Sequence, residues 1–98
     1  MRVAVHFNPE KNNAPECAGK VCEILLGDGA EVSVSPVYKE RFSKYSGIEF
    51  AELTDSVSVS DFVIAIGGDG TMLRCAKKLI GCNAKMIGVN TGRLGFMA

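Results

Sequence analysis

The residues best suited to chemistry lie in a glycine-rich stretch that follows a run of apolar residues. The apolar run is Phe62-Val63-Ile64-Ala65-Ile66, and the stretch after it is Gly67-Gly68-Asp69-Gly70-Thr71. Glycines can take positive φ and let a ligand approach the backbone, and the N–H groups at the start of a following helix attract anions. Asp69 is unusual there because a carboxylate repels phosphate. A metal, a hydroxyl or a proton-transfer role would compensate this repulsion, so the stretch predicts a loop that handles a phosphate and a hydroxyl together.

Two common phosphate-binding patterns do not fit this stretch. The P-loop pattern carries a lysine that is absent here, and GxGxxG fails because Leu73 takes the place of its last glycine. Thr71 can cap the following helix or donate to a ligand oxygen. A plainer alternative stays open on the loop alone, namely a tight strand-to-helix turn with a solvated Asp69.

The flanking elements must position this loop. A short apolar run bounded by turn residues is typical of a strand covered on both faces, as in a parallel sheet. The loop then lies at the carboxyl end of a strand, where open α/β sheets bind ligands. Residues 85–89 read as the next strand, after a helix that Gly81 ends. The shared apolar face of that helix is expected to comprise Met72, Leu73, Ala76, Leu79 and Ile80.

The first part of the chain predicts a βαβ unit with a right-handed crossover. Residues 2–7 alternate as a strand, and residues 30–35 form a second strand. Asn13 and Glu16 resemble a capping box at the start of the helix between them. The segment 37–60 is the least readable, with a short amphipathic piece or flap followed by a second short helical or irregular piece.

The composition limits the classes of protein to which this chain can belong. Ninety-eight residues suit one domain, and a formal net charge of zero gives no argument for nucleic-acid or membrane binding. No apolar stretch is long enough to span a bilayer and no signal peptide is present, so we expect a cytoplasmic protein. His6 reads as structural, and no metal ligands are assigned. The cysteines are interpreted as reduced thiols, since Cys17, Cys22, Cys75 and Cys82 lack CxxC spacing.

Two motifs carry a family resemblance. Residues 67–71 resemble the GGDGT motif shared by NAD kinases, diacylglycerol and sphingosine kinases and, in looser form, phosphofructokinases. The stretch Gly88-Val89-Asn90-Thr91-Gly92-Arg93-Leu94-Gly95-Phe96 resembles the G-[IV]-N-x-G-x-L-G-F segment of NAD kinases. Lipid kinases have a proline-led GTGND-type segment instead. The chain therefore resembles the N-terminal domain of NAD kinases.

This resemblance implies a fold and a domain organisation. The fold is α/β, a Rossmann-like or phosphofructokinase-like three-layer domain with a mostly parallel sheet. Residues 1–98 would be the N-terminal domain, and the β-rich C-terminal domain of the family is absent from this chain. We therefore expect the 98 residues alone to be inactive. The full-length protein is expected to be a homo-oligomer whose partners are nucleotides, without nucleic acid or membrane.

The resemblance also implies a reaction and its residues. The γ-phosphate of ATP would pass to the 2′-hydroxyl of the adenosine ribose of NAD, giving NADP, with Mg²⁺ or another divalent cation on the ATP. Asp69 would accept the hydroxyl proton or orient the hydroxyl. The nucleotide-binding residues would be Gly67, Gly68, Gly70, Thr71, Arg74, Asn90, Leu94 and Phe96.

Plainer interpretations and other functions stay open at this point. Arg74 can be a solvated helix charge, and Leu94 and Phe96 can be core residues. The protein can be another GGDGT-type kinase that acts on a lipid or a sugar phosphate, or a non-catalytic nucleotide-binding fragment. The phosphoryl donor, ATP or polyphosphate, and the choice between NAD and NADH are not readable from these residues.

Overall fold

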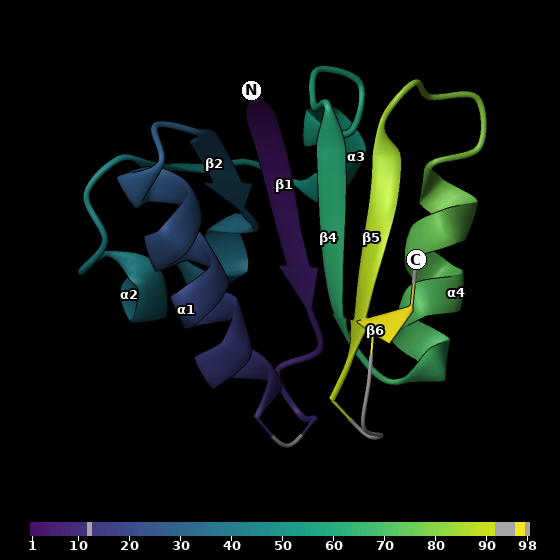
Figure 1. Ribbon diagram of the computed structural model, residues 1–98, viewed down its shortest axis with the longest axis horizontal. Coiled ribbons are helices and arrows are strands. Elements are labelled where there is room, and N and C mark those ends of the chain that lie inside the picture. Colours follow the sequence, from purple (N-terminus) through teal and green to yellow (C-terminus); the bar gives the residue numbers. More distant parts are fainter. Residues whose placement is uncertain (12, 92–95, 98) are drawn as a thin grey trace.

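A parallel sheet extended by one short antiparallel strand forms the middle layer of the computed structural model (Figure 1). The structure describes residues 1–11, 13–91 and 96–97. The strand order is β3-β2-β1-β4-β5-β6, and only β6 runs antiparallel to its neighbour. The strands are β1 (Arg2–Phe7), β2 (Glu31–Val34), β3 (Ile48–Phe50), β4 (Phe62–Gly67), β5 (Lys85–Asn90) and β6 (Phe96–Met97).

Helices cover both faces of the sheet, which gives the three layers that the sequence predicted (Figure 1). The long helix α1 (Ala14–Gly27) packs against β1, β2 and β4 on one face. The helix α4 (Asp69–Lys78) packs against β4 and β5 on the other face, and the short α3 (Leu53–Ser56) contacts β1. The 3₁₀ turn η1 (Pro36–Tyr38) leads directly into α2 (Lys39–Phe42).

Alternation along the strands divides the core into two clusters. In β1 the residues Val3, Val5 and Phe7 face α1, whereas Ala4 faces α3 and α4. The α1 side is closed by Ala14, Ala18 and Cys22, while the α4 side is closed by Met72 and Cys75. A strand covered on both faces must be apolar at successive positions, which explains the unbroken apolar run of β4.

Most of the predicted elements are confirmed, and the segment 37–60 contains one strand that the sequence did not predict. Residues 48–50 form β3, which pairs with β2 at the edge of the sheet. None of its three residues is fully buried. Its sequence, Ile-Glu-Phe, alternates, but three residues are too few for alternation to identify a strand.

The capping box predicted at Asn13 is wrong. Asn13 adopts a left-handed conformation with φ 65°, and its side chain makes no capping hydrogen bond. A capping side chain reaches back to the helix from an extended backbone, which this conformation does not supply. The carbonyl of Asn13 still accepts the first helical bond, from the N–H of Cys17 at 2.9 Å.

The predicted apolar face of α4 is only partly right. Met72 is buried, but Leu73 is 60% exposed and Ile80 is 80% exposed. Among the strands the helix packs mainly against β4 and β5, and its far side is exposed at Leu73. Cys75, 1% exposed, packs on the side of the helix that faces the sheet.

Four observations bear on the class of protein. No described helix combines the length and the apolar character that crossing a membrane requires. Within the described part of the chain, no group of three or more His, Cys, Asp or Glu side chains is placed to hold a metal ion. The four cysteines are free thiols. His6 is half-buried, and its pKa is lowered by burial and then by the positive charges of Lys78 and Arg74.

Candidate active site

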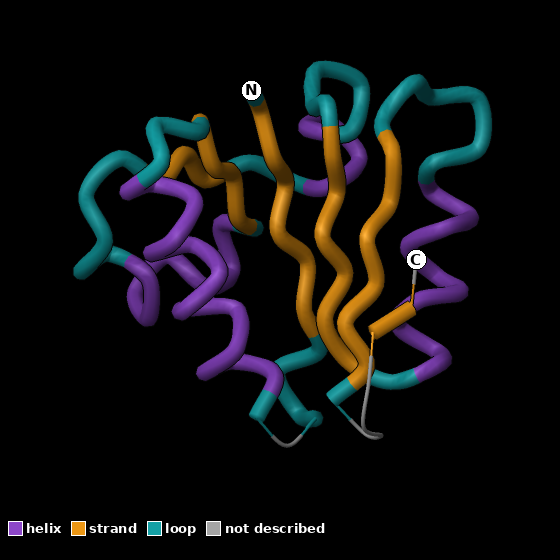
Figure 2. Tube along the Cα trace, in the orientation of Figure 1, coloured by secondary structure: helices purple, strands orange, loops and turns teal. Residues whose placement is uncertain are grey.

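The carboxyl ends of β1, β4 and β5 meet at one edge of the sheet, where the loops after them gather (Figure 2). β1 and β4 are neighbours, yet the chain leaves β1 for α1 on one face and leaves β4 for α4 on the other. Such a reversal of direction opens a crevice at the carboxyl ends of the two strands, and ligands of open α/β sheets bind there. The GGDGT stretch lies at this point.

The strand β4 passes into α4 with a single residue between them. β4 ends at Gly67, Gly68 is the N-cap in an extended conformation, and Asp69 is the first helical residue. The N–H groups of Thr71 and Met72 donate to the carbonyl of Gly68 at 3.1 and 3.2 Å. Asp69 therefore sits at the positive end of the helix dipole, which stabilises a negative charge.

Gly67 has a steric reason to be glycine. A Cβ at this position would lie 2.6 Å from Oγ1 and 2.9 Å from Cβ of Thr71. Of the three motif glycines, only Gly67 has a positive φ. Gly68 is extended and Gly70 is helical, so neither position uses the positive φ that glycine allows.

The predicted cap at Thr71 is also wrong. Thr71 is the third residue of α4, and the N-cap is Gly68. Its side chain is 2% exposed, and Oγ1 has no hydrogen-bond partner among the described residues. The hydroxyl lies under Gly67, on the inner side of the strand-to-helix turn.

A side-chain hydrogen bond and a backbone hydrogen bond, from the N–H of Thr91 to the carbonyl of Gly67 at 3.0 Å, join the two motifs. The pairing of β4 with β5 sets Gly67 opposite Asn90, and Nδ2 of Asn90 donates to Oδ1 of Asp69 at 2.8 Å. Asn90 is 6% exposed, so the packed end of β5 holds the donor in place. The bond to an ionised carboxylate is of the stronger kind, and it fixes the direction of the Asp69 carboxylate.

Two cationic side chains flank Asp69. A Cβ on Gly70 would lie 3.4 Å from Nη1 of Arg74, so this guanidinium folds back along the helix toward the motif. A Cβ on Gly68 would lie 3.1 Å from Cε and 3.3 Å from Nζ of Lys11. Sequence reasoning found Arg74 but missed Lys11, because only the adjacency of β1 and β4 brings Lys11 to the motif.

Two predicted residues cannot be placed. Leu94 lies outside the described residues. Phe96 belongs to β6, whose backbone pairs with Val89 of β5, but its side chain lies outside what the structure describes. The structure therefore brings together Gly67, Gly68, Asp69, Gly70, Thr71, Arg74 and Asn90 from the predicted set.

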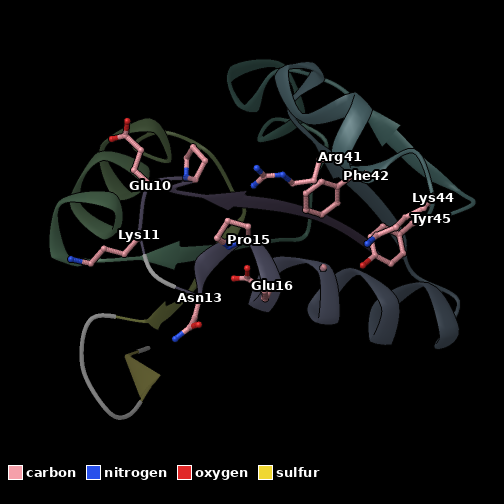
Figure 3. Close-up of a pocket in the computed structure, with 11 residues that line it drawn as sticks. Glu10, Lys11, Asn13, Pro15, Glu16, Arg41, Phe42, Lys44 and Tyr45 are labelled. Carbon is pink, nitrogen blue, oxygen red and sulfur yellow. The ribbon is translucent and has the colours of Figure 1, made fainter.

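A cleft of about 450 Å³ opens beside this edge, between the loop after β1, the start of α1 and the segment around α2 (Figure 3). Glu16 from α1 and Arg41 from α2 both point into it (Figure 3). Lys11 lies on its margin, and its side chain extends away from the cleft on the side of α4 (Figure 3). Lys11 is therefore the residue shared by the cleft and the motif.

The fold and the site define a class, the Rossmann-like α/β domains that bind a phosphorylated ligand at the carboxyl edge of the sheet. The comparison with known families then identifies the particular family. A model for the N-terminal domain of ATP-NAD kinases matches residues 3–98. The chain belongs to the NAD kinase family.

Individual relatives agree with this assignment. The NAD kinase of Bacteroides fragilis is 33% identical over 102 residues, covering 100% of this chain and 35% of the relative. That of Thiobacillus denitrificans is 38% identical over 77 residues, covering 79% of this chain and 26% of the relative. A crystal structure of an NAD kinase from Archaeoglobus fulgidus in complex with ATP has a TM-score of 0.59 at 26% identity, over 93% of this chain and 28% of that one. The chain thus spans about a third of the length of the curated relatives it matches over its whole length.

Proposed function

We propose that this chain supplies the N-terminal part of the catalytic site of an NAD kinase. The reaction transfers the γ-phosphate of ATP to the 2′-hydroxyl of the adenosine ribose of NAD and yields NADP and ADP. The observation that carries this proposal is the hydrogen bond from Asn90 to Asp69. It joins the GGDGT motif to the second motif, the one that separates NAD kinases from lipid kinases.

Asp69 acts as the base in this proposal. As the 2′-oxygen forms its bond to the γ-phosphorus, the hydroxyl proton passes to the carboxylate. The bond between the γ-phosphorus and the bridging oxygen breaks, and ADP leaves with the electron pair. Asn90 holds one carboxylate oxygen of Asp69, so the base is oriented before the substrate arrives.

The remaining motif residues bind and orient. Gly67, Gly68 and Gly70 leave the backbone open to phosphate oxygens, because no Cβ stands in front of it. Arg74 opposes phosphate charge from the side of Gly70. Thr71 stays in the proposed binding set, with its buried hydroxyl supporting the loop from under Gly67. Leu94 and Phe96 are proposed to line the NAD pocket.

Mg²⁺ or another divalent cation enters this proposal with the nucleotide. Mg²⁺ is usually held by one or two carboxylates together with substrate phosphates. One carboxylate, that of Asp69, stands at the site, and the described residues hold no larger ligand cluster. This donor set fits an ion that arrives on ATP, where it neutralises phosphate charge.

The wider organisation is proposed on the same resemblance. Residues 1–98 form the N-terminal domain, and a β-rich C-terminal domain completes the nucleotide site in the full natural chain. We expect that protein to be a cytoplasmic homo-oligomer and the 98 residues alone to be inactive. The lengths of the relatives support this division.

The test is NADP formation from NAD and Mg-ATP by the full natural chain and its Asp69→Asn variant. The introduced amide oxygen can still accept the hydrogen bond from Asn90, so the variant removes the base and keeps the contact. We expect turnover to fall by roughly 10² to 10⁴-fold. The melting temperature should fall only slightly, because the variant loses the negative charge at the helix N-terminus and keeps the contact with Asn90. Asp28→Asn, at an exposed carboxylate after α1, is the control and should keep full activity.

Two results would overturn the proposal. Near-normal turnover by Asp69→Asn would remove Asp69 from the role of base. Phosphorylation of a diacylglycerol or a sugar phosphate without NADP formation would assign the protein to another branch of GGDGT kinases.

A further inference from the structure

The start of α4 presents an electrostatic problem for a nucleotide. Its backbone N–H groups attract phosphate, but its first side chain is the carboxylate of Asp69. Phosphate groups that come close enough to be transferred must approach this negative charge. A cation that faces the same N-terminus is needed to offset the repulsion, and the motif itself contains none.

Lys11 is placed to supply that cation. The register of β1 and β4 sets Phe7 opposite Ile66, and the N–H of Asn8 donates to the carbonyl of Ile66 at 3.0 Å. The end of β1 is therefore tied to the end of β4. The chain then crosses above Gly68, where a Cβ would meet the Lys11 side chain at 3.1 Å.

Local hydrogen bonds fix the turn that carries Lys11. Oδ1 of Asn8 accepts from the N–H of Glu10 at 3.0 Å. The carbonyl of Asn8 accepts from the N–H of Lys11 at 3.2 Å, and the carbonyl of Lys11 accepts from the N–H of Ala14 at 3.2 Å. Asparagine side chains form such turns with their own backbone. The Lys11 backbone is thus held between β1 and α1, while its side chain lies over the motif.

The ammonium group is available to a ligand. Across the described ranges the structure has one ion pair, between Arg2 and Glu31, so Lys11 is not engaged by a described carboxylate. The two flanking cations differ in origin, since Arg74 reaches Gly70 along α4 and Lys11 reaches Gly68 from the turn after β1. The buried Thr71 hydroxyl, which has no described partner, lies under Gly67.

We propose that Lys11 binds a phosphate oxygen of the bound nucleotide and so provides the cation that the GGDGT loop lacks. This inference rests on the proposed function, because the nucleotide is taken to be a substrate of the kinase. The phosphate belongs either to the donor triphosphate or to the NAD pyrophosphate. The role resembles that of a P-loop lysine, but the residue comes from a neighbouring strand. Glycine at position 68 keeps the space for the Lys11 stem.

The test compares Lys11→Met, Lys11→Arg and Lys20→Met in the full natural chain. Lys20 is an exposed lysine on α1 and is the matched control. We expect Lys11→Met to raise the KM of one nucleotide by about tenfold or more, since it loses a charge-assisted hydrogen bond. Lys11→Arg should restore most of the loss, and Lys20→Met should behave as wild type. An increase in the KM of ATP places the phosphate on the donor, and an increase in that of NAD places it on the dinucleotide.

Calorimetric binding separates this inference from the proposed function. Mg-ATP, inorganic triphosphate, NAD and adenosine are titrated into each variant, whether or not NADP is formed. Weaker binding of any of the phosphorylated ligands by Lys11→Met, with unchanged binding of adenosine, supports the role of Lys11 even if no NAD kinase activity is found. Unchanged binding of all the phosphorylated ligands overturns it. An equal loss for adenosine also overturns it, because the effect would then not depend on phosphate.

Discussion

Replacing Gly67 with alanine is the sharpest test of the strand-to-helix turn. The added Cβ would lie 2.6 Å from Oγ1, 2.9 Å from Cβ and 3.1 Å from Cγ2 of Thr71. Thr71 is 2% exposed and is packed in the first turn of α4, so it cannot rotate into solvent. The turn must open instead, and Asp69 would move with it.

The cost can be worked from this overlap. Forcing a methyl group into a packed site costs typically about 1–3 kcal/mol, and three contacts under 3.2 Å place Gly67→Ala in the middle of that range. For a domain of this size, about 2 kcal/mol lowers the melting temperature by roughly 10 °C. Thermal unfolding followed by circular dichroism measures this shift.

Two further variants make the result decisive. Gly27→Ala, at the last residue of α1, meets nothing within 4 Å and should change stability by less than about 1 kcal/mol. Thr71→Ala removes two of the three close atoms, so combining it with Gly67→Ala should recover part of the loss. Wild-type stability in Gly67→Ala, or no recovery in the double variant, would refute the steric reasoning.

Two other properties are expected of the folded protein. Because the pKa of His6 is lowered by burial and by Lys78 and Arg74, the unfolded chain binds more protons between that lowered pKa and 6.5. Stability should therefore fall as the pH drops below 6.5. The variant His6→Gln, which removes the only histidine, should reduce the dependence of the melting temperature on pH in this range. An unchanged pH dependence in this variant would contradict the assignment of the effect to His6. Burial also raises the pKa of the Cys22 thiol to about 11. Alkylation at pH 8, read by mass spectrometry, should modify half-buried Cys82 long before fully buried Cys22, and equal rates would disprove this order.

The sequence predicted the elements in which buried positions recur at a regular spacing. β1 alternates between two cores, and the unbroken apolar run of β4 reflects cover on both faces. The edge strand β3 has only three residues, Ile48–Phe50, and none of them is fully buried, so its alternation is too short to identify a strand. Leu73 and Ile80 have helical spacing, but α4 packs mainly against β4 and β5, so their exposure depends on what lies beside the helix.

The sequence predicted those residues of the candidate site that belong to recognisable motifs. Asp69 and Asn90 stand 21 positions apart, and pairing of β4 with β5 makes them hydrogen-bond partners, a contact that the sequence did not predict. Lys11 has no motif of its own. Its place beside Gly68 follows from the adjacency of β1 and β4, a tertiary fact that no local pattern of residues contains.

The direct passage from β4 into α4 has a mechanical consequence. With Gly68 as the single residue between strand and helix, the motif contains no hinge, and Asp69 must move as one body with the sheet and the helix. Lys11 is different, because its ammonium sits on a flexible four-carbon stem. The edge is therefore stiff at the candidate base and adjustable at the candidate phosphate contact. In the proposed role, the Lys11 stem would follow phosphate chains of different length while the Asp69 carboxylate kept its direction.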